Sequence, residues 1–200
     1  MAMPPNSSQN IGFYGGSFDP IHNGHLELAK ELLEKAHLDR ILFSPANQAP
    51  LRDRPYGAST EDRFTMVSAA VTDIPNLEAT DIEIQAGGTN FTLDTLRTLK
   101  SKMQNANFSV IIGADQLAKL PRWRHVEDLA KETEFLVLAR PGHQLSTPPE
   151  LPDLRFHSFD TREFEVSSSE VRNRIRDHLP IQELVPPPVA AIITQRKLYR

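Results

Sequence analysis

Short apolar runs rich in β-branched and aromatic residues alternate along the chain with segments whose apolar positions recur at helical spacing. This alternation is typical of βαβ units, which build a parallel sheet with helices on both faces. Periodicity predicts strands at 11–14, 40–44, 82–84, 108–113, 135–139 and 154–159, and helices that begin near residues 23, 59, 93, 167 and 189. We therefore expect a single α/β domain with a Rossmann-like, doubly wound parallel sheet.

The same pattern sets the expected boundaries. Residues 1–10 are polar and proline-bearing, without the basic and apolar regions of a signal peptide, so we expect a flexible leader before a domain at 11–200. The triplet Ile82-Glu83-Ile84 alternates with a period of two, which predicts a more exposed strand closed by Gly87-Gly88. The prolines at 186–188 are expected to interrupt the chain before the last helix.

Composition narrows the classes of function. The chain has 200 residues, a formal net charge of −4 and no cysteine. This charge balance does not indicate a bulk nucleic-acid binder, and the lack of cysteine excludes disulfides, thiolate zinc sites and thiol catalysis. No segment reaches the roughly 20 apolar residues that span a bilayer. We expect a cytoplasmic protein with no nucleic-acid or membrane partner, and a homo-oligomer stays possible.

The loop after the first predicted strand, Gly15 to His25, carries the densest candidate chemistry. Ligands of open α/β sheets bind beyond the carboxyl ends of the strands, and Gly15 and Gly16 permit close approach by a ligand. His22 and His25 stand three apart at a helix start, so both face the positive end of the helix dipole and can donate to a polyphosphate. From the residues alone, a surface histidine pair or part of a metal site stays open. The spacing matches neither a dinucleotide fingerprint nor a P-loop.

A second candidate element precedes the helix predicted near residue 167. Ser167 with Glu170 forms a capping box, which by itself accounts for the serine there. The alternative is that the hydroxyls, the free amides and Arg172 at the same helix start hold triphosphate oxygens. The residues themselves leave both interpretations open.

The two elements resemble known motifs. Gly15 to His25 is similar to the G-G-[ST]-F-D-P-x-H-x-G-H signature of the nucleotidylyltransferase superfamily, and 166–172 is similar to its I-S-S-T-x-I-R motif, with conservative departures at Val166, Ser169 and Val171. The resemblance implies the nucleotidyltransferase fold and a role for His22 and His25 in stabilising charge on departing pyrophosphate. It implies an ATP site formed by Gly15, Gly16, Ser17, Phe18, His22, Gly24, His25, Gly113, Asp115, Ser168, Ser169 and Arg172.

Further segments resemble the bacterial nicotinate mononucleotide adenylyltransferase family. The similar segments are 45–52 (P-N-x-x-P-P-H-[KR]), 90–92 (S-Y-T), 111–115 (I-I-G-x-D), Trp123, 139–142 (R-R-P-G) and 198–200 (L-Y-R). The resemblance implies a mononucleotide site formed by Ser17, Asn47, Arg52, Thr92, Trp123, Arg124 and Arg140. Leu51 departs from the family pattern, which usually has histidine there, and this departure leaves the amide mononucleotide open as acceptor.

Each of these residues also has a plainer interpretation. The Trp123 ring can stack on a pyridine ring or can simply pack against the protein. Asp115 can accept from ribose hydroxyls or cap a helix. Arg122 and Arg124 can favour an acid over an amide or be solvated, and Arg140 meets either a phosphate or an acidic neighbour.

The resemblance implies adenylyl transfer from ATP to nicotinate mononucleotide, giving nicotinate adenine dinucleotide and pyrophosphate in NAD biosynthesis. The acceptor phosphate is ionised at neutral pH, so catalysis needs alignment and charge stabilisation rather than a general base. We expect Mg²⁺ held mainly by ATP phosphates, with no metal site made of protein ligands. The alternatives are nicotinamide mononucleotide or phosphopantetheine as acceptor, or a regulator that holds ATP without turning it over.

Overall fold

The computed structural model describes residues 8–51, 54–139, 145–161 and 166–200. Within them, one sheet contains the strands β1 (Gln9–Gly16), β2 (Arg40–Pro45), β3 (Leu77–Ala79), β4 (Ala106–Gly113), β5 (Glu134–Ala139) and β6 (Phe156–Asp160). All neighbouring strands are parallel, in the order β3-β2-β1-β4-β5-β6. This is the strand order of doubly wound dinucleotide-binding folds, so the predicted fold class is confirmed.

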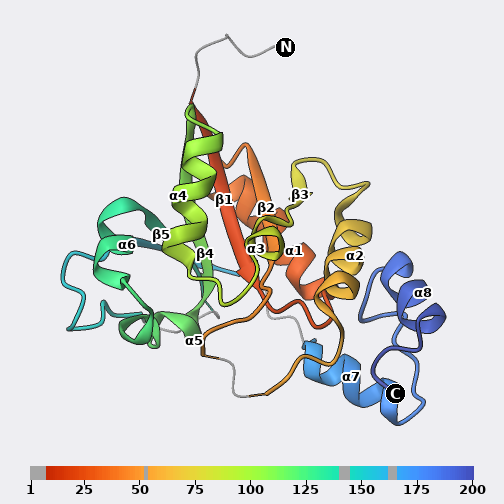
Figure 1. Ribbon diagram of the computed structural model, residues 1–200. Coiled ribbons are helices and arrows are strands. Elements are labelled where there is room, and N and C mark those ends of the chain that lie inside the picture. Colours follow the sequence, from red (N-terminus) through yellow and green to blue (C-terminus); the bar gives the residue numbers. More distant parts are fainter. Residues whose placement is uncertain (1–7, 52–53, 140–144, 162–165) are drawn as a thin grey trace.

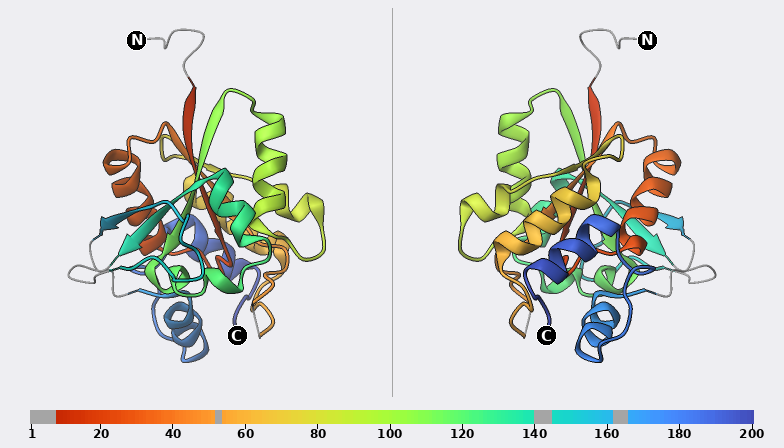
Figure 2. Two further views of the ribbon diagram at one scale, coloured as in Figure 1. Left: turned by 90° about the vertical axis from the view of Figure 1, so that its left-hand side faces the viewer. Right: turned by 90° about the vertical axis from the view of Figure 1, so that its right-hand side faces the viewer.

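Helices cover both faces of this sheet, as Figures 1 and 2 show, with α1 and α4 on opposite sides of the strands. The helices are α1 (Asn23–Lys35), α2 (Thr60–Val71), α3 (Ile82–Ala86), α4 (Thr92–Lys102), α5 (Ala114–Leu117), the 3-10 helix η1 (Leu120–Arg122), α6 (Val126–Glu132), α7 (Ser168–Arg176) and α8 (Pro187–Gln195). In the described ranges, no helix combines the length and apolarity that crossing a bilayer requires.

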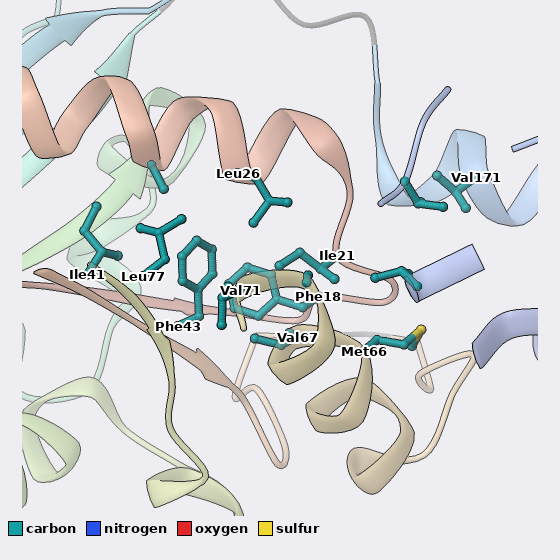
Figure 3. Packing of buried hydrophobic residues seen from close by; sticks show 14 of the residues in the cluster. Phe18, Ile21, Leu26, Ile41, Phe43, Met66, Val67, Val71, Leu77 and Val171 are labelled. Carbon is teal, nitrogen blue, oxygen red and sulfur yellow. The ribbon is translucent and has the colours of Figure 1, made fainter. Parts of the chain in front are cut away.

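The central strands are apolar on both sides because each side meets a helical layer. On β2, Ile41 and Phe43 pack with helices α1, α2, α7 and α8, whereas Leu42 between them packs with α3, α4 and α6. Figure 3 shows the first of these layers, with Phe43 beside Leu77 and facing Leu26 of α1. Each continuous apolar run in the sequence therefore supplies side chains alternately to the two core layers, one on each face of the sheet.

The strand predicted at 82–84 is wrong, because these residues begin helix α3 and the edge strand is β3, before them. A three-residue alternation is too short to separate a strand from one helical turn. The buried side chains are the neighbours Ile82 and Glu83, which a strand would point to opposite faces. Tertiary burial therefore decided the local conformation.

Two predicted boundaries also move. The prolines do not interrupt the chain: Pro186 caps α8, and the next two prolines form its first turn, where a backbone N–H has no intrahelical partner to lose. Strand β1 starts at Gln9, inside the expected leader, because Gln9 and Asn10 pair with β4. Residues 1–7 lie outside the described residues.

Candidate functional site

The strand order reverses between β1 and β4, which is where a doubly wound sheet leaves a crevice beyond its strand ends. A cavity of about 570 Å³ lies there, lined by the ends of β1 and β4, the loop at 46–51, α3, the start of α4 and η1. Gly15 and Gly16 at the end of β1 and Ser17 just after it form part of its wall. The volume suits a small organic ligand. The fold thus places a ligand-sized space beside the predicted first loop.

Phe18 differs from its neighbours in this loop. Its side chain is 2% exposed and belongs to the core beside Val67 and Phe43 (Figure 3). The ring centroids of Phe18 and Phe43 are 5.6 Å apart. The side chain is therefore a packing element, and only the Phe18 backbone is available to a nucleotide.

His22 and His25 stand together at the start of α1, as their spacing predicts. Their rings stack with centroids 3.7 Å apart, and His22 is the N-cap residue. The backbone N–H of His22 donates to Nδ1 of His25 at 3.2 Å. Because Nδ1 accepts, a neutral His25 ring carries its proton on Nε2 and can donate from there. Nδ1 of His22 is buried without a hydrogen-bond partner among the described residues.

The protonation of this pair depends on its surroundings. Burial lowers the pKa of His22 to about 4, and burial together with the neighbouring His22 lowers the pKa of His25 well below its usual value. Both rings are therefore neutral near pH 7 in the free protein. A bound polyanion reverses this balance by stabilising the charged ring. The pair can thus supply positive charge when a phosphate chain is present.

The start of α7 docks directly on the first loop. Oγ of Ser168 donates to the Pro20 carbonyl at 2.8 Å, and Nη1 of Arg172 donates to the Asp19 carbonyl at 2.6 Å. Ser169 Oγ accepts from Arg172 Nη2 at 3.1 Å. Ser167 also caps the helix by accepting from the Glu170 N–H, which confirms the cap, and the role of this segment in holding phosphates stays a prediction. The two motifs are distant in sequence but are in direct contact in the structure.

Gly24 is required for this docking. A Cβ atom at Gly24 would lie 2.8 Å from Cγ1 of Val166 and 3.2 Å from Nδ1 of His22. Contacts below 3.0 Å do not occur in real structures without movement of the neighbour. A side chain here would push the start of α7 away from α1, so the glycine permits the close approach of the two motifs.

Asp19 has a role that the sequence indicates only as a turn. Its carboxylate is buried and accepts from the N–H groups of Gly57 at 2.9 Å and Ala58 at 3.1 Å. Tyr199 packs over Gly57, where a Cβ would lie 2.8 Å from its ring. Burial and the Asp19 carboxylate raise the pKa of the Tyr199 hydroxyl. Asp19 therefore joins the first loop to the start of α2 and to the last residues of the chain.

Arg63 of α2 is a second residue that sequence reasoning missed. Its side chain is fully buried, and it donates to the carbonyls of Ser17 at 2.8 Å and Ala46 at 2.7 Å. The guanidinium lies 3.8 Å from the centre of the Tyr56 ring. It thereby ties the end of β1 to the end of β2. The sequence could have indicated the burial of Arg63, because it stands four residues before Val67 and so shares the buried face of the helix.

The far wall of the cavity is aromatic and cationic. Trp123 lines the cavity and also packs against the core layer that contains Leu42, so stacking and packing are compatible. Thr92 is the first residue of α4, whose N-cap Phe91 offers no side-chain cap, so first-turn N–H groups are available to an anion. The Arg124 guanidinium lies 4.7 Å from the centre of the Phe91 ring, and both residues line the cavity with Arg122.

Three other residues predicted for the mononucleotide site are not found among the described residues that form the wall of the cavity. Asn47 does not line the cavity; its side chain donates to the Gly88 carbonyl, and its N–H donates to Oδ1 of Asn90, which joins the two flanking loops. Arg52 and Arg140 lie outside the described residues.

The end of β4 supplies one wall residue and one exposed acid. Gly113 lines the cavity and is the N-cap of α5, so the alternative that Asp115 caps this helix is wrong. Asp115 is exposed and pairs with Lys119 at 3.1 Å. Burial, and to a smaller extent the negative charge of Asp115, raises the pKa of Tyr14. Tyr14 lines the cavity, and the centroid of its ring lies 6.1 Å from that of His25. Tyr14 thus connects the cavity with the histidine pair.

Among the described residues, carboxylates do not cluster around the cavity or around the first loop. Within the described parts of the chain, no group of three His, Cys, Asp or Glu side chains could hold a metal ion. The Asp19 carboxylate already accepts backbone N–H groups. The donors near the first loop are imidazole, hydroxyl and guanidinium groups, which suit phosphate oxygens rather than a hard cation.

Comparisons with known proteins match most of this chain to one family model and to relatives along nearly their whole length. The model of the family described as cytidylyltransferase-like matches residues 13–174. A probable nicotinate-nucleotide adenylyltransferase of Opitutus terrae is 40% identical over 190 residues, covering 95% of this chain and 97% of the relative. One of Bacillus licheniformis is 36% identical over 191 residues, covering 96% and 98%.

A solved structure shares the fold. A nicotinic acid mononucleotide adenylyltransferase of Plasmodium falciparum, complexed with NaAD, has a TM-score of 0.78 at 21% identity, and the match covers 96% of this chain and 97% of that one. At this identity the likeness supports the fold alone. With the motif geometry and the sequence relatives, the conclusion is that this chain belongs to the nicotinate-nucleotide adenylyltransferase family of cytidylyltransferase-like proteins.

Proposed function

We propose that this protein transfers the adenylyl group of ATP to nicotinate mononucleotide, giving nicotinate adenine dinucleotide and pyrophosphate in NAD biosynthesis. The observation that carries the proposal is the docking of Ser168 and Arg172 on the Asp19-Pro20 turn, next to the histidine pair. This arrangement supports a phosphate site beside a cavity that ends in Trp123 and the start of α4.

In this mechanism an oxygen of the acceptor phosphate attacks the α-phosphorus of ATP. The bond between the α-phosphorus and its bridging oxygen breaks, and pyrophosphate leaves with the electron pair. His22 and His25 donate hydrogen bonds to the phosphate oxygens on which charge accumulates, while Ser168, Ser169 and Arg172 hold the leaving chain. No side chain needs to remove a proton, because the attacking phosphate is already ionised.

We expect Mg²⁺ to enter with ATP rather than to be held by protein ligands, and among the described residues no group of three His, Cys, Asp or Glu side chains could hold it. The ion would be coordinated mainly by phosphate oxygens and water, and it would neutralise part of the triphosphate charge. Gly15 and Gly16 allow the phosphates to approach the backbone. We place the ribose hydroxyls of ATP near Gly113 and Asp115, at the end of β4.

The acceptor lies in the cavity. The pyridine ring stacks on Trp123, and the nicotinate carboxylate receives hydrogen bonds from the first-turn N–H groups at Thr92, at the positive end of α4. Arg124 adds positive charge at the same wall. Ser17, Arg52 and Arg140 are proposed for the acceptor phosphate, and Asn47 holds the two loops beside the cavity together.

The decisive experiment compares nicotinate and nicotinamide mononucleotides as acceptors with ATP and Mg²⁺, by pyrophosphate release and product chromatography. We expect turnover with a preference for the acid. Preference for the amide would assign the acceptor to the family's other pyridine mononucleotide, and the departure at Leu51 makes this comparison necessary. ATP binding without pyrophosphate release would overturn the reaction itself.

Arg172→Lys is expected to raise the KM for ATP by about 10- to 100-fold, since a charge-assisted hydrogen bond contributes about 1.5–3 kcal/mol. Lysine keeps the charge but cannot reach both the Asp19 carbonyl and Ser169 as the guanidinium does. Steady-state kinetics with each substrate varied measure this effect. Arg176→Lys, exposed on the same helix, is the matched control. An unchanged KM for ATP in folded Arg172→Lys would contradict the assignment.

Trp123→Ala is expected to raise the KM for the mononucleotide by about 3- to 30-fold, because stacking on a cationic ring is worth about 0.5–2 kcal/mol. The KM for ATP should change little, since Trp123 lies at the other end of the site. Trp123→Phe, which keeps a flat ring, should recover most of the loss. Equal increases in both KM values would indicate a general packing defect instead.

A further inference from the structure

Glu83 is a buried acid in the wall of the acceptor cavity, and neither the fold nor the proposed chemistry accounts for it. The residue is 6% exposed, and it lines the cavity with Thr92, Trp123 and Arg124. Within the described residues, no cationic side chain lies within ion-pair distance of its carboxyl group. An ionised carboxylate is costly in such a place.

The hydrogen bonds around Glu83 bear on its protonation state. Oγ1 of Thr95 lies 3.1 Å from Oε1 of Glu83 and 3.3 Å from the Phe91 carbonyl oxygen. A hydroxyl has one hydrogen and cannot satisfy two acceptors fully. If the Glu83 carboxyl is protonated, its O–H donates to Thr95 Oγ1 and the threonine hydrogen goes to Phe91. The shared threonine hydrogen thus fits a neutral Glu83 as well as an ionised one, and burial outweighs the hydrogen bond from Thr95 and raises the pKa of Glu83 to about 7.

This hydrogen-bonded chain ends at the anion site. Phe91 is the N-cap of α4, so fixing its carbonyl fixes the first turn whose N–H groups face the ligand. The Glu83 backbone carbonyl accepts from Nδ2 of Asn90 at 3.0 Å, which holds the preceding loop in place. Glu83 is thus linked to both sides of the helix start by its own contacts.

Other titratable groups on these elements are engaged elsewhere or are exposed. Arg40 of β2 pairs with Glu78, Arg97 of α4 pairs with Glu132, and Asp81 at the start of α3 accepts from Gln85. Arg122, Arg124 and Tyr14 line the same cavity without bonding to Glu83. Ionisation of Glu83 would therefore place a negative charge beside the ligand, with no ion-pair partner among the described residues.

We propose that Glu83 is a positioning residue that sets acid-over-amide selection: in its neutral form it orders the α4 start for the nicotinate carboxylate, and its ionisation repels that carboxylate. The inference rests on the proposed function, because it assumes that the acid mononucleotide occupies this cavity. The carboxamide of nicotinamide mononucleotide carries no charge and would not feel the same repulsion, whereas the pyridinium charge is common to both mononucleotides. Selectivity should therefore fall as pH rises.

The test measures KM for both mononucleotides between pH 6 and pH 8, with nicotinamide mononucleotide as a competitive inhibitor if it turns over too slowly. The ratio of the two constants cancels the titration of the phosphate that both carry. In the wild type, the KM for the acid divided by the KM for the amide should rise about tenfold from pH 6 to pH 8, because only protein with neutral Glu83 binds the acid well. In Glu83→Gln, which stays neutral, the ratio should be flat.

Glu34→Gln, exposed on α1, is the matched control and should keep the wild-type slope. A flat ratio in the wild type overturns the inference without any variant, and so does a slope that persists in Glu83→Gln. If neither mononucleotide is turned over at any pH, the proposed function itself fails, which is a distinct result. A slope in the wild type that Glu83→Gln abolishes supports the assignment.

Discussion

His25→Ala and His22→Ala are each expected to lower kcat by about 10²–10³-fold, the usual cost of removing a preorganised donor to a developing charge. The two rings stack at the N-terminus of α1, and the His22 N–H orients His25 so that Nε2 can donate. Both pKa values are depressed in the free protein, so we expect the positive charge to arise when a phosphate chain binds. The loss should therefore appear in kcat rather than in stability alone.

Single-turnover kinetics with saturating ATP would measure this loss directly. His157→Ala, on the exposed edge strand β6, is the control and should leave the rate unchanged. Circular dichroism and thermal unfolding check that the variants remain folded. Turnover near the wild-type rate in either folded variant would contradict the assignment of the pair.

Arg63→Met is expected to lower the free energy of unfolding by about 2–5 kcal/mol, because it leaves buried carbonyl oxygens without their donor. Methionine replaces the apolar part of the side chain but cannot donate to Ser17 and Ala46. Those carbonyls lie at the ends of β1 and β2, beside the cavity. Weaker binding of both substrates should accompany the lower stability.

Urea unfolding followed by circular dichroism would measure the change. Arg155→Met, whose side chain is 59% exposed in a surface pair with Glu134, should change stability by less than about 1 kcal/mol. Stability of Arg63→Met within the range of that control would show that the buried guanidinium contributes little. Arg63→Lys separates charge from geometry, since one ammonium group cannot reach both carbonyls as the guanidinium fork does.

The phosphate role of the two motifs came only from their resemblance to known motifs, but the sequence by itself determined the fold class and the helix starts. These follow from local properties: the apolar runs of β4 and β5, the helical stripe of α1, and the serines at positions 59 and 167 that accept from backbone N–H groups at helix starts. Such signals act within a few residues of each other, so spacing alone reveals them. The candidate residues Trp123 and Thr92 both line the cavity, and their role in binding the mononucleotide stays a prediction.

Only the tertiary structure decided how distant segments meet. The helix at Ile82 and Glu83 replaces an expected strand because both side chains are buried together, and the side chain of Phe18 belongs to the core. The contact of Gly24 with Val166 and the burial of Arg63 depend on segments far apart in the chain. Periodicity reports which face of an element is buried, but the partner across that face is set by packing, and packing assembled the site.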